Sequence, residues 1–307
     1  MTGSIEKGTH IMMYLPDKKT ALFTIDDFIA RGGEGEVYKA TNGDDTTFCV
    51  KYLSGAFIRN PKLTQGKLME LARRARDLPP ELVSILAVSD VFPGGGIFYA
   101  MHYLDGYEDL AKIIIHPDKY TVEMKTKILL GVARAFDALA KSKHHFGDIS
   151  EKNILYKFEG FEPKIRIIDV EGIMPDKPNS VPSVEGTGLF RAPEVIKGGS
   201  PNIQSDIHAF SVLAFRMFMG RHPLDTSECR RQDAFGQTEF KRFYADFPRF
   251  IFDLEAPDRA LPPNVIRRWG ALSDGLRTFF LCNFSQTALH RRVDRLDYKR
   301  FIELASR

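Results

Sequence analysis

The apolar residues of this chain change their spacing near residue 106, and this change limits the folds that the sequence can adopt. Residues 21–104 contain short runs in which apolar and polar side chains alternate, separated by turn sequences such as "TNGDD" and "PGGG". Alternation over short runs is typical of strands, so this part predicts a small antiparallel sheet. One segment, "KLTQGKLMELARRARDL", has apolar residues at helical spacing and predicts a single helix within the sheet region.

After residue 106 the pattern is mainly helical. The segment "TVEMKTKILLGVARAFDALAKSKHH" begins with Thr121 as a predicted N-cap and carries one apolar stripe. Two strand-like runs, "ILYKF" and "KIRIIDV", follow it, and residues 202–306 are again mainly helical. We therefore expect a β-rich part over 20–104 and an α-rich part over 105–307, preceded by a leader or flexible N-terminus over 1–19.

Composition argues against several classes of protein. The net charge of only +3 is too small for a dedicated nucleic-acid binder. The most apolar run, residues 209–220, is short and contains Arg216, so we expect no membrane span. The three cysteines form no CxxC pair, which argues against disulfides and a zinc site and favours the reducing cytoplasm.

A glycine cluster lies in the stretch "IARGGEGEVYKA", residues 29–40. Glycines at positions 32, 33 and 35 allow the backbone to approach a phosphate group closely. The flanks are strand-like on both sides, whereas a P-loop or dinucleotide fingerprint would open a helix. A phosphate-covering hairpin is therefore one interpretation, and a plain hairpin turn is the other.

Lys51 stands inside the apolar run "FCVKYL", sixteen residues after Gly35. A lysine at this position could hold phosphates and would need an acidic partner. Glu70 is the candidate, because it is the only acidic residue before Asp77 in the predicted helix. Two simpler interpretations stay open: Lys51 faces solvent on an alternating strand, or Glu70 pairs at the surface with a nearby arginine.

The stretch "HHFGDISEKNIL", residues 144–155, places Asp148 and Asn153 five positions apart. A carboxylate that orients an attacking hydroxyl and an amide oxygen that binds metal are both needed for phosphoryl transfer. Asp169 ends the apolar run "RIIDV" and is a second candidate metal ligand. Asp, Ser and Asn also favour ordinary turns, which is the alternative for this stretch.

The order of these motifs resembles that of the eukaryotic-like protein kinase family. Ala192-Pro193-Glu194 ends a segment of 25 residues after Asp169, as the activation segment of that family does. The resemblance covers about 20–306 and implies an α+β, two-lobed protein kinase-like fold. The motif "DVEG" and the stretch "FPRFIFDLEAP" suggest a bacterial branch, in which a PP2C-type phosphatase and a von Willebrand A-type protein are implied partners.

The resemblance also implies roles for individual residues. ATP would lie under residues 30–37, with Mg²⁺ or Mn²⁺ bound by Asn153 and Asp169, and Asp148 would orient a Ser or Thr hydroxyl of a protein substrate. Catalysis would depend on Asp148, Lys51 and Asn153. The implied nucleotide-binding residues are Ala30, Gly32, Gly33, Gly35, Val37, Lys51, Glu70, Met101, Tyr103 and Leu155.

Two residues depart from the family pattern. Gly147 replaces the arginine that usually reads a phosphate on the activation segment, so we expect activity without such a phosphate. Ser150 replaces the lysine that usually neutralises the γ-phosphate, and Thr187 is expected to hydrogen-bond near Asp148. The resemblance further implies a buried Asp206 and an ion pair between Glu194 and Arg292.

Two alternative functions remain at this point. A small-molecule phosphotransferase of the aminoglycoside- or choline-kinase type shares the G-D-x-x-x-x-N loop, and a pseudokinase would bind nucleotide without transfer. The segment "GTGLFRAPEV" favours a protein kinase over the first, and the retained Lys51, Asp148, Asn153 and Asp169 favour it over the second. Candidate autophosphorylation sites are Ser180, Ser183 and Thr187.

Overall fold

The computed structural model describes residues 4–33, 35–177, 187–230, 236–255, 257–290 and 294–306. The chain forms two compact units, one made of Met1–Tyr107 with Asp169–Glu171 and the other of Glu108–Ile168 with Gly172–Arg307. The division falls after Tyr107, where the sequence pattern predicted it after residue 104. Ser180 and Ser183 lie outside the described residues.

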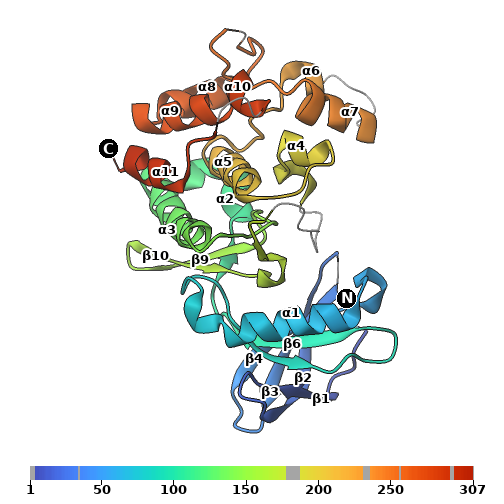
Figure 1. Ribbon diagram of the computed structural model, residues 1–307. Coiled ribbons are helices and arrows are strands. Elements are labelled where there is room, and N and C mark those ends of the chain that lie inside the picture. Colours follow the sequence, from blue (N-terminus) through green and yellow to red (C-terminus); the bar gives the residue numbers. More distant parts are fainter. Residues whose placement is uncertain are drawn as a thin grey trace. The chain divides into compact units, whose positions relative to one another are not determined.

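The first unit is a closed antiparallel barrel with strand order β1-β2-β3-β4-β6-β5 (Figure 1). One helix, α1 (Pro61–Arg73), packs on this barrel against β5 and buries Leu68, Leu71 and Ala72. Asn60 caps its start by accepting a hydrogen bond from the Leu63 amide, and Pro61 occupies the first turn, where no backbone donor is needed. The strands are β1 (His10–Tyr14), β2 (Thr20–Arg31), β3 (Gly35–Asn42), β4 (Thr47–Leu53), β5 (Ile85–Ser89) and β6 (Ile97–His102).

Residues 10–14 do not form part of the leader or flexible N-terminus that the sequence predicted over 1–19. Strand β1 pairs with β2 along its whole length and with β5 at its end, and it buries Ile11 and Met13. The Ser4 backbone and hydroxyl both donate to the Glu36 carboxylate, at 2.9 and 2.5 Å. The alternation of buried Ile11 and Met13 with exposed neighbours is the strand signal in this segment.

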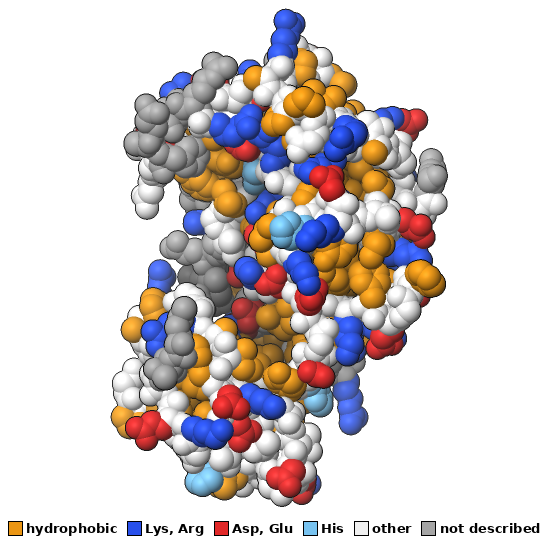
Figure 2. All heavy atoms as spheres, turned by 180° about the vertical axis from the view of Figure 1, so that it is seen from behind, with side chains coloured by type: hydrophobic (Ala, Val, Ile, Leu, Met, Phe, Trp, Pro, Cys, Tyr) orange, Lys and Arg blue, Asp and Glu red, His pale blue; other side chains and the backbone are white. Residues whose placement is uncertain are grey.

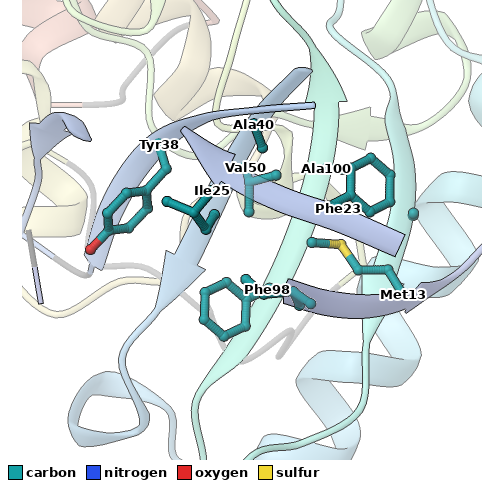
Figure 3. Packing of buried hydrophobic residues seen from close by; sticks show 10 residues of the cluster. Met13, Phe23, Ile25, Tyr38, Ala40, Val50, Phe98 and Ala100 are labelled. Carbon is teal, nitrogen blue, oxygen red and sulfur yellow. The ribbon is translucent and has the colours of Figure 1, made fainter. Parts of the chain in front are cut away.

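The interior of the barrel is filled by side chains from all six strands, Ala87 from β5 among them. Figure 3 shows that they point toward one another, with Met13 from β1, Phe23 from β2, Tyr38 from β3, Val50 from β4 and Phe98 from β6. Phe23 meets Phe48 edge to face at 5.2 Å between ring centroids, a favourable arrangement for aromatic pairs. The packed barrel gives Lys51 on β4 a rigid support.

The second unit is mainly helical. Its longest helices are α3 (Val122–Lys141), which Thr121 caps as predicted, and α5 (Ile203–Met219). The other α-helices are α2 (Ala111–Ile115), α4 (Pro193–Ile196), α6 (Ser227–Arg230), α7 (Gln237–Lys241), α8 (Pro263–Gly270), α9 (Asp274–Asn283), α10 (Gln286–Leu289) and α11 (Tyr298–Ala305). The strands are β7 (Glu108–Asp109), β8 (His144–His145), β9 (Ile154–Glu159), β10 (Glu162–Ile167) and β11 (Met174–Pro175).

Helix α5 is buried almost throughout its length and packs against α2, α3, α8 and α9 (Figure 1). Asn202 and Ser205 form a capping box at its start, and Gly220 ends it with a left-handed φ of 72°. Phe215 lies among aromatic rings, including Phe250 at 5.4 Å and Phe280 at 5.3 Å between centroids. This core holds the N-terminal turn of α5, which carries Asp206, in a fixed place.

The β-rich first unit and the helical second unit confirm the predicted α+β class. On the face seen in Figure 2, acidic and basic side chains are intermixed, which agrees with the small net charge of +3. All three cysteines are free. Within the part of the chain that the structure describes, no helix has the length and apolar character that crossing a bilayer requires.

Candidate active site

The glycine cluster forms the turn between β2 and β3. The Gly32 amide donates to the Gly35 carbonyl at 2.8 Å, and Ala30 pairs with Val37 across the ladder. A Cβ on Gly35 would lie 1.9 Å from the Tyr52 carbonyl oxygen, so only glycine fits there. Gly33 has open space around it, which leaves the tip of the turn accessible.

Lys51 projects from β4 between Val37 on β3 and Tyr99 on β6, its direct partners in the two ladders. Its Nζ donates to Asp169 Oδ1 at 2.8 Å and to Glu171 Oε1 at 2.5 Å. Only 10% of the Lys51 side chain is exposed, and the same fraction of Glu171. The interpretation of Lys51 as a solvent-facing strand residue is therefore wrong.

The electrostatics of this cluster follow from burial and close charges. Burial alone would lower the pKa of Lys51, but the carboxylates of Glu171 and Asp169 more than offset it and raise that pKa. Burial likewise acts to raise the pKa of Glu171, and the Lys51 ammonium outweighs it, so the pKa is lowered. The first unit thus favours the charged forms of Lys51 and Glu171. Asp169 itself has φ 60°, a left-handed conformation that Asp tolerates better than most residues.

Glu70 does not fill the role predicted for it. Its carboxylate lies 3.9 Å from Arg73, one of the surface arginines that the sequence offered as an alternative partner, and 58% of its side chain is exposed. Leu71 faces the barrel, and the residue four positions before it, Lys67, shares that face of α1. The helix therefore turns Lys67 inward and leaves Glu70 outside.

Glu171 is the functional candidate that sequence reasoning missed. It stands at the third position of the motif Asp169-Val170-Glu171, where the family pattern has glycine, and this replacement was the available signal. Its second oxygen, Oε2, accepts a hydrogen bond from the Tyr99 hydroxyl at 2.9 Å. Tyr99 and Lys67 are likewise new members of the cluster.

The remaining predicted nucleotide-binding residues are divided between the units. Met101 is buried on β6 opposite Cys49, and Tyr103 follows that strand with 37% exposure. The Lys39 ammonium lies 5.5 Å from the centroid of the Tyr103 ring, within cation–π range. Leu155 lies on β9 of the second unit, opposite Arg166.

In the second unit, Asp148 is held on both carboxylate oxygens. Oδ1 accepts from the Thr187 amide at 2.7 Å and from the Thr187 hydroxyl at 2.9 Å, which confirms the expected Thr187 contact. Oδ2 accepts from Asn153 Nδ2 at 2.9 Å, and the same nitrogen donates to the Asp148 carbonyl at 2.9 Å. These bonds fix the orientation of a carboxylate that still borders a surface pocket.

The loop before Asp148 is anchored by Asp206, which is buried as predicted. Its carboxylate accepts from the Phe146 amide at 2.5 Å and the Gly147 amide at 3.0 Å. Burial raises the pKa of Asp206 to about 7, although the two backbone bonds act in the opposite direction. Gly147 has φ 85°, a conformation that favours glycine, so the loop is held without a side chain at this position.

The ion pair of Glu194 involves Arg295, and Arg292 lies outside the described residues. Arg295 Nη1 and Nη2 donate to the two Glu194 oxygens at 2.8 and 2.9 Å, a bidentate geometry. The Arg295 side chain is 1% exposed. The sequence offers three arginines in "HRRVDR", and their spacing alone did not point to Arg295.

Asn153 in the second unit and Asp169 in the first each offer an oxygen of the kind that Mg²⁺ prefers. Because Asn153 Nδ2 makes both bonds to Asp148, its Oδ1 is the atom that could ligate a cation. Mg²⁺ is commonly bound by one or two protein groups together with substrate phosphates. The described residues contain no group of three or more His, Cys, Asp or Glu that could hold a metal alone.

Known proteins resemble this chain over most of its length. Residues 23–274 match the model of the protein kinase domain. A receptor-like serine/threonine-protein kinase of Arabidopsis thaliana is 26% identical over 226 residues, 68% of this chain and 58% of that protein. A probable serine/threonine-protein kinase of Clostridium perfringens is 27% identical over 246 residues, 78% of this chain and 32% of that protein.

The chain thus spans only part of the length of these two relatives. Among solved structures, the twitchin kinase region from C. elegans superposes with a TM-score of 0.67 at 16% identity. That match covers 92% of this chain and 44% of the other, and at this identity it shows the shared fold.

Proposed function

Because the chain belongs to the protein kinase family, we propose that it transfers the γ-phosphate of ATP to Ser or Thr hydroxyls of a protein substrate. The arrangement around Asp148 carries this proposal. Its carboxylate is oriented by Thr187 and Asn153 and borders a pocket that Thr187 and Phe190 help to line. A carboxylate placed in this way can accept or orient the proton of an attacking hydroxyl.

The remaining roles follow from the chemistry of each group. Lys51 offers a fixed positive charge to the α- and β-phosphates, and the open space around Gly33 would let the backbone approach them closely. Asn153 and Asp169 would hold Mg²⁺, or Mn²⁺ in its place, and the bound ion neutralises charge on the β- and γ-phosphates. Most of the catalytic effect then comes from positioning and charge.

Gly147 supports an activity that does not need a phosphate on the activation segment, and Ser150 bears on how the γ-phosphate is neutralised. The loop is anchored through the backbone of residues 146 and 147 by Asp206, so no arginine side chain is required to order it. Ser150 is 2% exposed and supplies no charge. We therefore propose slower transfer than in a kinase that has lysine at this position.

Further parts of the proposal are supported by the sequence alone. The motif "DVEG" and the stretch "FPRFIFDLEAP" suggest a bacterial kinase, with a PP2C-type phosphatase and a von Willebrand A-type protein as partners. The free cysteines suggest a reducing compartment such as the cytoplasm.

Transfer of radiolabelled phosphate from ATP with Mg²⁺ tests the proposed reaction. We expect label in generic protein substrates with the wild-type chain and its loss in Asp148→Ala, and phosphoamino-acid analysis should find phosphoserine or phosphothreonine. Label that enters only an added aminoglycoside would establish a small-molecule kinase instead. Nucleotide binding without any transfer would identify a pseudokinase.

A further inference from the structure

We propose that Glu171 positions Lys51 for the phosphates of ATP, a task that protein kinases assign to a glutamate on the helix of the N-terminal lobe. The inference rests on the proposed function, because it concerns the residue that prepares Lys51 for nucleotide. It assigns a role to a residue that occupies the glycine position of the motif Asp169-Val170-Glu171. Glu171 would be a positioning residue, since it acts through Lys51.

The first argument is the contact itself. Glu171 uses one oxygen for each of two neighbours, accepting from Lys51 Nζ at 2.5 Å and from the Tyr99 hydroxyl at 2.9 Å. Lys51 and Tyr99 face each other across the β4–β6 ladder, so Glu171 bridges two side chains of adjacent strands. A carboxylate bonded on both oxygens has little freedom to move, and it restricts the lysine in turn.

The second argument is that the inner face of helix α1 carries a lysine, where the family has a glutamate. Lys67 lies four positions before the buried Leu71 and shares its face of α1. Burial lowers the pKa of Lys67 to about 8, and the Glu171 carboxylate acts in the opposite direction. Glu70 lies on the outer side of the helix beside Arg73. The charges are therefore exchanged relative to the family pattern, with the acid on the Asp169 segment and a lysine on the helix.

The third argument is charge balance. Lys51 is enclosed by two carboxylates, Asp169 and Glu171, and these two negative charges would exceed one buried positive charge. Lys67 is a second basic group near Glu171 and offsets part of this excess. Buried charges are tolerated when they are paired and hydrogen-bonded, and Lys51, Asp169 and Glu171 satisfy that condition.

One consequence concerns how Lys51 and the metal ligand are linked. Asp169 and Glu171 lie two residues apart on one short segment, so the same segment holds a metal ligand and the partner of the lysine. In the usual arrangement the two come from different elements, and movement of the helix can separate them. Here the Lys51 ion pair does not depend on an acid of α1.

Binding of MgADP by calorimetry, with no protein substrate present, tests the inference. We expect Glu171→Gln to weaken binding on the order of tenfold to hundredfold, the range for loss of a buried charge-assisted hydrogen bond. The matched variant Glu70→Gln makes the same chemical change on α1 and should leave the affinity unchanged. The reverse order of the two effects would overturn the inference.

A second pair of variants separates positioning from a general structural role. In a Lys51→Met background, Glu171→Gln should have no further effect on MgADP affinity, because its action passes through Lys51. An equal loss in both backgrounds would overturn the inference. If melting shows that Glu171→Gln is unfolded, Glu171→Asp replaces it, since it keeps the charge but shortens the reach to Lys51. That variant should lose affinity severalfold, and an unchanged affinity contradicts the assignment.

Failure of the proposed function would be visible in the wild-type chain alone, as binding of MgADP without phosphate transfer, or as no binding. Failure of the Glu171 assignment would be visible only as a difference among variants. The two outcomes are therefore read from different measurements.

Discussion

Lys51 in the first unit and Asp148 in the second are held by different kinds of partner. Lys51 is surrounded by the side chains of Asp169 and Glu171, and Glu171 is bonded to a third side chain, Tyr99. Asp148 accepts from the Thr187 backbone amide as well as from the Thr187 hydroxyl and Asn153 Nδ2, and its loop is anchored by two backbone amides that donate to Asp206.

This difference explains why the Asp148 loop keeps the residue spacing of the family, whereas the acidic partner of Lys51 stands at another place in the sequence. A side-chain partner can come from any element that brings a carboxylate close to Lys51, so its place in the sequence is free to change. Backbone donors have the positions that the loop conformation gives them, and that conformation needs Gly147 at φ 85°. The loop therefore keeps its five-residue spacing, while the acid has moved from the helix to Glu171.

The largest expected effect on stability concerns Arg295, which forms a side-chain ion pair with Glu194 inside the second unit. Arg295→Ala leaves the Glu194 carboxylate, 14% exposed, without its bidentate partner. Removing one member of a buried pair costs about 3–5 kcal/mol, which urea unfolding would measure. Arg300→Ala, in an exposed pair with Glu303, should cost less than about 1 kcal/mol. Similar losses in both variants would contradict the account.

Asp206→Ala tests the backbone anchoring of the catalytic loop. The variant leaves the amides of Phe146 and Gly147 without an acceptor, and each unsatisfied buried donor costs about 1–3 kcal/mol. We expect a total loss of about 2–5 kcal/mol in unfolding free energy. Asp206→Asn keeps one acceptor oxygen and should fall between wild type and Asp206→Ala. A loss below about 1 kcal/mol in Asp206→Ala would show that the loop is anchored in another way.

His222 is a third group of the second unit that is hydrogen-bonded to the backbone. Its Nε2 donates to the Leu189 carbonyl at 2.8 Å, and its Nδ1 accepts from the Leu224 amide at 3.1 Å. Burial lowers the pKa of His222 from 6.5 to about 3. The unfolded chain therefore binds a proton near pH 6.5 that the folded chain takes up only near pH 3.

The contribution of His222 to stability is complete above its pKa of 6.5 in the unfolded chain. It decreases as the pH falls toward its pKa of about 3 in the folded chain. At pH 5 the expected loss is about 2 kcal/mol relative to pH 7.5. Unfolding titrations at the two pH values, compared between wild type and His222→Gln, would measure it. A wild-type pH dependence as small as that of the variant would contradict the assignment.

The smallest expected effect concerns the Thr187 hydroxyl. Thr187→Val removes one bond to Asp148 Oδ1 and keeps the backbone bond to the same oxygen. A single hydrogen bond of this kind is worth about 0.5–1.5 kcal/mol, so the transfer rate should fall about 2- to 10-fold. Thr187→Ser keeps the hydroxyl and should stay near wild type. A loss of more than about a hundredfold in Thr187→Val would mean that the backbone bond does not hold Asp148.

Much of the fold could be predicted because it depends on local patterns. The change of apolar spacing, the Thr121 cap and the Asp148–Asn153 spacing are all encoded within short stretches of sequence. Strand β1 was missed because five residues before a turn carry a weak signal, although the burial of Ile11 and Met13 follows the alternation.

The partners of charged residues could not be predicted in the same way. Lys51 and Glu171 are 120 residues apart, and only the folded chain shows that they meet. Arg295 could not be chosen from "HRRVDR", since its burial and its pairing with Glu194 are seen only in the folded chain. For Glu70, the helical spacing did indicate the outward orientation, because Lys67 and not Glu70 shares the face of the buried Leu71.

The central claim is that Asp148 serves phosphate transfer whereas the Lys51 cluster serves nucleotide binding. The most direct measurement is the transfer rate of Asp148→Asn at saturating ATP, with MgADP affinity determined on the same preparation. We expect transfer to fall on the order of 10²- to 10⁴-fold with MgADP affinity within about twofold of wild type. Transfer at the wild-type rate, or a loss of affinity that matches the loss of rate, would contradict the claim.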